Sequence, residues 1–389
     1  MKKLAIITTH PIQYYAPVFK LLHQRQQMAI KVFYTWGENA VKKYDPGFNK
    51  EIEWDIPLLD GYPYEWVVNT SKNVGSHYFN GIMNPRLIDQ INEWQPDALL
   101  VYGWGYRSHL KVLRHFKNKI PVFFRGDSTL LDYMPRSKSI LRTALLKWVY
   151  RNVDHAFYVG LNNKAYFKKY GLKDEQLTFA PHAIDNDRFA GLRKTESDAL
   201  RYKAGIPADA ILVLFAGKLE EKKAPSLLLD AFLQLKQVNL HLLFVGNGQL
   251  EQQLKETAAG NANIHFMDFF NQSLMPVVYQ ACDLFCLPAK GPGETWGLAV
   301  NEAMACGKAI LVSDKVGCAA DLVSDNSNGY VFKAGDITDL ILKLKKLTEN
   351  KETLLRYGEQ SLIVIRDWNF VNIAKAIEGR LLNEKKRQD

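Results

Sequence analysis

Short apolar runs alternate with longer helical patterns along the whole chain. Continuous apolar runs of this kind, separated by helices, are typical of parallel strands that are buried on both faces of a sheet. The series occurs twice, which predicts two doubly wound α/β domains, each resembling a Rossmann fold. The runs of the first half are LAIITT, IKVFYT, ALLVYG, IPVFFRG, HAFYVG and LTFAP, and those of the second are ILVLFAG, LHLLFVG, NIHFMD, DLFCLP, AILVSD and GYVFK.

A polar stretch near residues 190–208 separates the two series and ends in a turn rich in Gly and Pro. We therefore expect an N-terminal domain over residues 1–190 and a second domain over residues 205–365. Ligands are expected at the carboxyl ends of the strands and in a cleft between the domains. Residues 366–389 include an amphipathic pattern that predicts a last helix.

The formal net charge of +9 lies entirely in the first half of the chain. Residues 1–190 contain 26 Lys and Arg against 17 Asp and Glu, whereas the remainder contains 24 of each kind. This asymmetry suggests that the first domain meets an anionic partner, which we take to be a membrane surface or a phosphorylated acceptor. Nucleic acid is disfavoured because no recognised binding module accompanies the charge.

The chain reads as a cytoplasmic protein. No apolar run approaches the 18 or more residues of a spanning helix, and the start MKKLAIITTHPIQ loses its apolar character at Thr8, as a first buried strand would. The cysteines Cys282, Cys286, Cys306 and Cys318 lack metal-site spacing, so reduced core thiols are expected. No paired carboxylates suggest a metal site, and no cofactor is expected.

Two glycine turns of the second domain follow buried strands. In FAGKLEEKKAPSLLLDAF, Gly217 is followed by Lys218, Lys222 and Lys223 and then by a helix from about Ser226. Lysines at a strand end beside a helix N-terminus suit a diphosphate, although a solvated charged loop is the alternative. The turn Gly246, Asn247 and Gly248 permits close approach of a ligand, or is merely tight. Because GxGxxG is absent after either first strand, a dinucleotide dehydrogenase is disfavoured.

The stretch GETWGLAVNEAMACG contains two glutamates, Glu294 and Glu302, in apolar surroundings. A strand ending at Pro288, a loop, and a helix over Gly297–Cys306 with Gly307 as its stop are expected. Burying a glutamate without a partner costs several kcal/mol, so both should be paired, exposed or turned toward a ligand. The spacing alone does not separate these alternatives.

Several motifs taken together resemble the retaining glycosyltransferases of family 4, which have the GT-B fold. The resemblance rests on GETWGLAVNEAMACGKAILVSD, GKLEEKKAPSLLLDAF, PHAIDNDRF and SDNSNGYVFKAGDITDL, and it covers roughly residues 155–345. It implies that Glu302 receives the ribose of a nucleotide sugar, and that Glu294 contacts the transferred sugar without acting as a nucleophile. It also implies that Lys218 and Lys223 neutralise the diphosphate without a metal ion.

The same resemblance implies the rest of a donor site and a last helix that crosses back to the first domain. The base, uracil or guanine, would lie near residues 267–270. Two positions depart from the family, since Lys218 replaces an Arg and Ala224 a Gly, and lysine lacks the bidentate fork. The donor-binding residues so implied, besides Glu302, are Gly217, Gly246, Asn247, Gly248, Met267, Phe269 and the segment Thr295, Trp296, Gly297 and Leu298.

Polar residues also follow the strands of the first domain. His10 and Gln13 follow the first strand, and Arg125, Asp127 and Ser128 follow the fourth. We expect His10, Gln13 and Arg125 on the acceptor side, and Asp127 in contact with the acceptor or the transferred sugar. The alternatives are that His10 caps a turn and that Asp127 lies in a surface turn.

Residues 136–173 carry nine basic residues and one acidic residue, Asp154. Within them, RSKSILRTALLKWVYRN interleaves basic and apolar positions. Such a helix either lies on an anionic membrane at the inner face of the plasma membrane, or packs Leu and Trp inward and leaves a solvated basic face.

The leading hypothesis is a retaining, metal-independent hexosyltransferase. It would move a sugar from a UDP- or GDP-linked donor to a glycan or lipid-linked acceptor, in the synthesis of a surface polysaccharide or glycoconjugate. A GT-B type nucleotide-sugar epimerase and a sugar-nucleotide-binding scaffold subunit are the alternatives.

Overall fold

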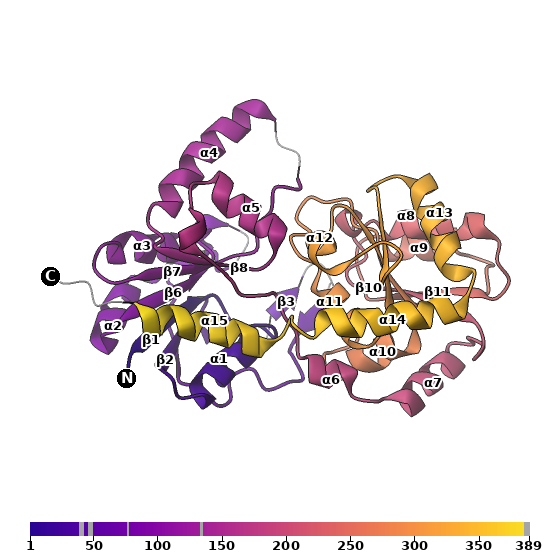
Figure 1. Ribbon diagram of the computed structural model, residues 1–389, viewed down its shortest axis with the longest axis horizontal. Coiled ribbons are helices and arrows are strands. Elements are labelled where there is room, and N and C mark those ends of the chain that lie inside the picture. Colours follow the sequence, from indigo (N-terminus) through magenta and orange to yellow (C-terminus); the bar gives the residue numbers. More distant parts are fainter. Residues whose placement is uncertain (39–42, 46–49, 76–77, 133–134, 385–389) are drawn as a thin grey trace. The chain divides into compact units, whose positions relative to one another are not determined.

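The computed structural model describes residues 1–38, 43–45, 50–75, 78–132 and 135–384 (Figure 1). The chain divides into two compact units. Unit 1 comprises residues 1–43, 56–181 and 370–389, and unit 2 comprises residues 44–55 and 182–369. The expected N-terminal domain over residues 1–190 included residues 44–55 and 182–190, but these two segments belong to unit 2.

Residues 44–55 group with unit 2 because their end contacts the segment after strand β12 (Ile264–Met267). The Asn271 side-chain amide donates to the Glu53 carbonyl at 2.7 Å, and the ring of Trp54 lies 6.4 Å from that of Phe269. The Ser273 backbone N–H donates to the Asp55 carboxylate at 3.1 Å. The short strands β3 (Lys43–Asp45) and β4 (Lys50–Ile52), which precede these contacts, form a sheet of their own.

Unit 1 is built on a seven-stranded sheet in the order β5-β2-β1-β6-β7-β8-β9, whose pairs are parallel. Six of these strands coincide with the apolar runs of the sequence. Edge strand β5 was not predicted, because its three residues, Tyr64, Glu65 and Trp66, form no apolar run. The bounds are β1 (Lys3–Thr8), β2 (Ala29–Tyr34), β5 (Tyr64–Trp66), β6 (Ala98–Tyr102), β7 (Val122–Arg125), β8 (His155–Tyr158) and β9 (Leu177–Phe179).

Helices cover the unit 1 sheet and bury its apolar residues in a core that includes Ile7, Val101 and Phe124. The last helix belongs to this unit, because α15 packs on α1 and the Glu378 carboxylate pairs with the Arg25 guanidinium at 2.8 Å (Figure 1). The bounds are α1 (Ala16–Gln24), α2 (Leu87–Trp94), α3 (Arg107–Phe116), α4 (Arg136–Tyr150), α5 (Leu161–Lys169) and α15 (Phe370–Asn383), with short 3-10 turns at Phe79–Gly81 and Asp174–Gln176.

Unit 2 has a six-stranded parallel sheet in the order β12-β11-β10-β13-β14-β15. All six strands coincide with predicted runs. Apart from Ile211, the apolar side chains of the four inner strands are buried, as covered parallel strands require. The bounds besides β12 are β10 (Ile211–Ala216), β11 (Leu240–Val245), β13 (Leu284–Leu287), β14 (Ala309–Ser313) and β15 (Gly329–Phe332).

The helices of unit 2 include α11, which lies over Leu298–Ala305 within the range expected from the sequence. Helix α8 begins at Pro225, one residue before the expected start, because proline is favoured in the first turn of a helix. The other bounds are α6 (Asn186–Ala190), α7 (Lys194–Lys203), α8 (Pro225–Leu235), α9 (Glu251–Thr257), α10 (Met275–Ala281), α12 (Ala319–Leu322), α13 (Ile337–Thr348) and α14 (Lys351–Ile365), with a 3-10 turn at Glu221–Lys223.

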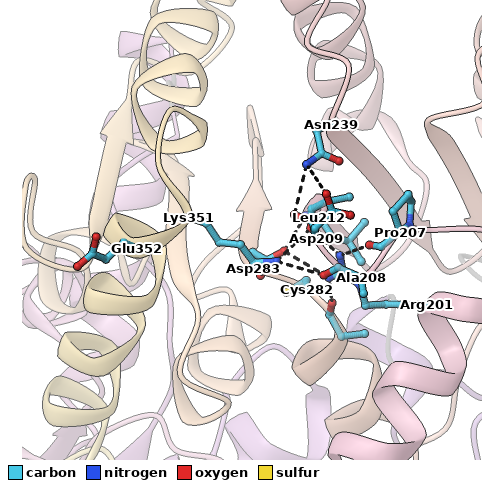
Figure 2. Close-up of polar contacts among 12 residues, drawn as sticks. Arg201, Pro207, Ala208, Asp209, Leu212, Asn239, Cys282, Asp283, Lys351 and Glu352 are labelled. Carbon is cyan, nitrogen blue, oxygen red and sulfur yellow. Dashed lines mark hydrogen bonds and ion pairs between the residues drawn. The ribbon is translucent and has the colours of Figure 1, made fainter.

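A buried polar network ties α7 to the amino ends of strands β10 and β13 (Figure 2). The Arg201 guanidinium donates to the carbonyls of Ala281, Pro207 and Ala210, and pairs with Asp283 at 3.3 Å. The Asp283 carboxylate also accepts the Leu212 backbone N–H at 2.8 Å. Because this network lies at the amino edge of the sheet, we assign it to the fold and not to the ligand site.

None of the described helices combines the length and the apolar character that crossing a bilayer requires. The four cysteines are free, and three of them are buried. Burial raises the pKa of the Cys282 thiol to about 12, so it behaves as an inert core residue.

Candidate functional site

The order of the unit 2 strands indicates a candidate ligand site between β10 and β13. The chain proceeds from β10 outward to β11 and β12, then returns to pair β13 on the other side of β10. At such a reversal the loops that follow the two central strands diverge and leave a crevice at the carboxyl edge. The loop of Gly217–Lys223 and the loop of Pro288–Gly297 therefore face each other here.

A buried ion pair joins these two loops. The Lys223 ammonium lies 2.8 Å from a carboxylate oxygen of Glu294, and the side chains are only 16% and 8% exposed, respectively. The backbone also joins the loops, since the Lys290 N–H donates to the Lys222 carbonyl at 2.9 Å. The sequence assigned Lys223 and Glu294 to the diphosphate and the sugar of one donor, and the structure brings these side chains into contact.

The segment Glu294–Gly297 is held rigidly by the segment before α12. Gly317 donates its backbone N–H to the Glu294 carbonyl at 3.1 Å, and Cys318 donates to the Trp296 carbonyl at 2.9 Å. A Cβ atom on Gly317 would lie 1.7 Å from the Thr295 carbonyl oxygen, so only glycine permits this approach. The loop before α11 is therefore preorganised.

The Trp296 side chain points into unit 2 and not toward solvent. It is buried, and its indole N–H donates to the Asn301 side-chain oxygen at 2.9 Å. Asn301 in turn donates to the His182 carbonyl at 3.0 Å. Only the backbone of Trp296 is thus left for a ligand, as for its more exposed neighbours Gly297 and Leu298.

Glu302 lies on α11 and is almost completely buried. Its carboxylate accepts a hydrogen bond of 2.8 Å from the hydroxyl of Tyr279, which is itself buried on α10. This hydrogen bond orients the Glu302 carboxylate. It also gives a buried carboxylate oxygen the donor that burial requires. No local pattern pointed to Tyr279, because it precedes Glu302 by 23 positions and only the fold brings α10 and α11 together.

The glycines after β11 are required by the packing of the neighbouring loop. A Cβ atom on Gly246 would lie 2.2 Å from the Gly217 carbonyl oxygen, and one on Gly248 would lie 2.4 Å from that of Leu219. Asn247 completes the connection, because its carbonyl accepts the Leu219 backbone N–H at 2.9 Å. Its side-chain oxygen accepts the Phe269 N–H at 3.2 Å. These contacts account for the tight turn, and any ligand contact there remains a prediction.

The remaining donor-site candidates line the same carboxyl edge. Gly217 and Lys218 follow β10, and Met267 ends β12 with its carbonyl accepting the Gly246 N–H at 3.0 Å. Ala224 has left-handed backbone angles, with φ of 50° and ψ of 46°. This explains why glycine is common at this position in the resembling family, because the left-handed region costs other residues about 1 kcal/mol.

The polar candidates of unit 1 follow strands β1 and β7 but differ in their surroundings. The His10 Nδ1 atom forms a hydrogen bond of 2.9 Å with the Thr9 hydroxyl, and the His10 ring packs edge-on against Trp36. Gln13 lies three residues before α1 and is half-buried. Arg125 is buried, and its guanidinium donates to the carbonyls of Ala180 and Pro181 at 2.8 Å each, which stabilises the segment after β9.

Asp127 lines a cavity at the carboxyl ends of β6 and β7. Its charge acts on a neighbouring tyrosine, because burial first and then the negative charge of Asp127 raise the pKa of Tyr15 above its usual range. Asp127 is half-buried, so it does not lie in a fully exposed surface turn.

Helix α4 shows an apolar face to solvent. Ile140 and Leu141 are 72% and 76% exposed, and Leu145 and Trp148 are exposed on the same face, whereas Leu146 and Val149 are buried. The alternative in which all the Leu and Trp side chains pack inward is therefore wrong for this helix. Arg142, Lys147 and Arg151 are exposed beside the apolar face.

Comparison with solved structures defines the class of the fold. The crystal structure of Anabaena HepE in complex with UDP and glucose superposes with a TM-score of 0.73. It is 18% identical in sequence, and the match covers 99% of this chain and 100% of that one. Two parallel α/β units arranged in this order are the GT-B fold.

Sequence comparison then relates the second unit to a family. The model for glycosyl transferases group 1 matches residues 196–362. A D-inositol 3-phosphate glycosyltransferase of Geodermatophilus obscurus is 27% identical over 199 residues, which are 48% of this chain and 43% of that protein. A phosphatidyl-myo-inositol mannosyltransferase of Mycobacterium leprae is 32% identical over 174 residues, which are 43% of this chain and 46% of that protein. Residues 196–362 are thus similar to the group 1 glycosyltransferases, and the chain spans less than half the length of these two relatives.

Proposed function

We propose that the protein transfers a sugar, with retention and without a metal ion, from a UDP- or GDP-linked donor to a glycan or lipid-linked acceptor. The Lys223–Glu294 ion pair at the reversal of strand order supports this most directly. A fixed cation at a preorganised loop is suited to stabilise a departing diphosphate. The matched relatives named for transfer to inositol phosphate and to phosphatidylinositol support a polyhydroxylated or lipid-linked acceptor.

In the proposed reaction, Glu294 has two tasks. It holds the Lys223 ammonium in place, and its second carboxylate oxygen binds a hydroxyl of the transferred sugar. Lys218 adds positive charge on the same loop, and the backbone of residues 295–298 provides N–H groups for the diphosphate. Glu302, oriented by Tyr279, binds the ribose hydroxyls, and residues 267–270 contact the base.

The acceptor would bind to unit 1, where Asp127 contacts it, and His10 and Gln13 lie at the same edge. Contact with an anionic membrane through residues 136–173 forms part of this proposal, and the exposed apolar face of α4 supports it. A surface polysaccharide or glycoconjugate is the expected product. The reaction would then take place at the inner face of the plasma membrane.

The experiment that tests the proposal measures ligand binding and donor turnover separately. A thermal shift screen against UDP-, GDP- and ADP-sugars should show one donor that raises the melting temperature, since a ligand that binds the native state stabilises it by mass action. Incubation with that donor alone should give slow hydrolysis to the nucleoside diphosphate. An isomeric nucleotide sugar would instead indicate an epimerase, and binding without any turnover would indicate a scaffold subunit.

A further inference from the structure

Unit 1 contains a cavity of about 360 Å³ that the proposed donor site does not use. It opens at the carboxyl ends of β6 and β7, and its lining lies wholly within unit 1. The volume falls near the lower end of the range of about 300–1,000 Å³ for small-molecule pockets. A cavity of this size suits one or two compact rings and not a long acyl chain.

The floor of the cavity is a rigid aromatic cluster. The rings of Phe124, Tyr150 and Phe167 pack edge to face with centroids 5.5–6.0 Å apart, and all three are buried. Trp104 lies on the wall and packs, partly buried, against the same apolar core. The aromatic surface is therefore present before any ligand binds.

The loop that carries Trp104 leaves space around it. Gly103 and Gly105 flank Trp104 in the sequence, and a Cβ atom built on either glycine would meet nothing within 4 Å. These glycines are thus not required by packing, in contrast to Gly246 and Gly248 of unit 2. Trp104 itself lines the cavity and is half-buried, so part of its surface is accessible there.

The polar part of the cavity carries a negative charge. Asp127 and Ser128 follow β7, and the Asn163 side chain donates to the Ser128 carbonyl at 2.8 Å, which holds this segment in place. No lysine or arginine of the described residues lines the cavity, although the first half of the chain carries the whole positive excess. The cavity therefore disfavours a phosphate and favours a neutral ligand with hydroxyl donors.

A pyranose ring matches this combination of surfaces. Its C–H face is apolar and packs on an aromatic side chain, while its hydroxyl groups donate to a carboxylate. We propose that this cavity, with Trp104 as the stacking residue and Asp127 as the hydroxyl acceptor, binds a neutral sugar ring of the acceptor. This inference rests on the proposed function, which it extends by naming the chemistry of the acceptor.

The test uses methyl pyranosides of glucose, galactose and mannose as neutral probes, and glucose 6-phosphate as an anionic probe. Binding to the full-length protein is measured by saturation-transfer NMR and by titration of tryptophan fluorescence. At least one methyl pyranoside should bind saturably through its C–H face, and glucose 6-phosphate should bind more weakly. Preference for the phosphate, or no saturable binding of any pyranoside, would overturn the inference.

Three variants locate the binding to the cavity. Gly105→Leu should abolish binding, because the leucine fills the space beside Trp104 without a strained backbone. Trp104→Ala should weaken binding about tenfold, with recovery in Trp104→Phe. Gly379→Leu on α15 is the matched control, since Gly379 is also exposed and unobstructed, and it should bind as the parent protein does. Unchanged binding in Gly105→Leu would contradict the assignment.

Hydrolysis of the donor without acceptor separates this inference from the proposed function. All the variants should hydrolyse the nucleotide sugar at the parental rate, because the cavity lies in unit 1 and the donor site in unit 2. Donor hydrolysis without binding of any pyranoside would leave the proposed function standing and remove the acceptor site. Pyranoside binding without hydrolysis of any donor would support the sugar-binding cavity and contradict the proposed transferase function.

Discussion

The Lys223 ammonium and the Glu294 carboxylate lie 2.8 Å apart, on loops that leave the two central strands of the unit 2 sheet in opposite directions. Their separation in sequence is 71 positions. The pair is buried at the carboxyl edge of the sheet, where each side chain is the other's ion-pair partner. Removing one member therefore affects both stability and the proposed chemistry.

Replacing Lys223 by Met should lower the free energy of unfolding by about 3 kcal/mol, because the buried Glu294 loses its partner. Donor turnover should fall about 100-fold or more, since a preorganised charge at the diphosphate is lost. The exposed pair Lys290–Glu221 provides the control, and Lys290→Ala should change stability by less than about 1 kcal/mol. The double variant Lys223→Met with Glu294→Gln should recover stability but not turnover. Full activity in Lys223→Met would refute the role of the lysine.

Replacing Ala224 by Gly should stabilise unit 2 by about 1 kcal/mol, because the residue has φ of 50° in a region that favours glycine. Calorimetry or urea unfolding measures the gain. Ala231→Gly, in the interior of α8, is the control and should lower stability by a similar amount, because glycine is a poor helix former. Equal destabilisation by the two changes would show that Ala224 is not strained.

Replacing Glu302 by Ala should abolish the thermal shift that the donor produces, while the fold is retained, because the proposed ribose contact is lost. Tyr279→Phe removes only the hydrogen bond that orients the carboxylate. It should raise the donor KM about fivefold to tenfold, consistent with about 1–1.5 kcal/mol for one hydrogen bond, and change kcat little. A normal thermal shift in Glu302→Ala would exclude the ribose assignment.

Charge on the exposed face of α4 should prevent membrane binding. The double variant Ile140→Asp with Leu141→Asp is expected to stay in the supernatant when sedimented with vesicles of phosphatidylglycerol at low salt, whereas the parent protein sediments. Leu355→Asp on α14 is the control, since Leu355 is 62% exposed on the other unit. Vesicles of phosphatidylcholine should bind the parent protein weakly. If the parent protein fails to sediment with either vesicle, the membrane contact is disproved.

The buried His109 should make unit 1 sensitive to acid. Burial lowers the pKa of its imidazole to about 4, although the Nδ1–H donates to the carbonyls of Tyr102 and Gly103. Because the unfolded chain binds the proton at its ordinary pKa of about 6.5, the stabilisation is complete above that pH and is lost as the pH falls toward 4.

Urea unfolding at pH 7 and pH 5 measures this effect, with an expected loss of about 2 kcal/mol from His109 alone. His155 is also buried with a pKa lowered to about 4 and adds to the loss. His109→Gln, which keeps a donor for the two carbonyls, should show a smaller difference between the two pH values than the parent protein. An equal difference would place the sensitivity elsewhere.

The sequence by itself determined the two sheets, because buried parallel strands require continuous apolar runs and these runs are visible one strand at a time. It also placed α11 and the basic turn after β10, since their signals are local. Edge strand β5 was not visible, because three partly exposed residues at an edge need no apolar run. The assignment of residues 44–55 to unit 2 was not visible either, since it depends on contacts with residues about 218 positions away.

Only the tertiary structure decided which polar groups meet. The pairing of Lys223 with Glu294 follows from strand order, and the contact of Tyr279 with Glu302 follows from the packing of α10 and α11, neither of which any local pattern encodes. The glycines after β11 could be interpreted from the sequence as a turn that contacts a ligand. In the structure, glycine is required there because the loop after β10 approaches the backbone closely. The direction of the apolar face of α4 was likewise undecided, because a helical period shows that a face exists and only packing shows which face is covered.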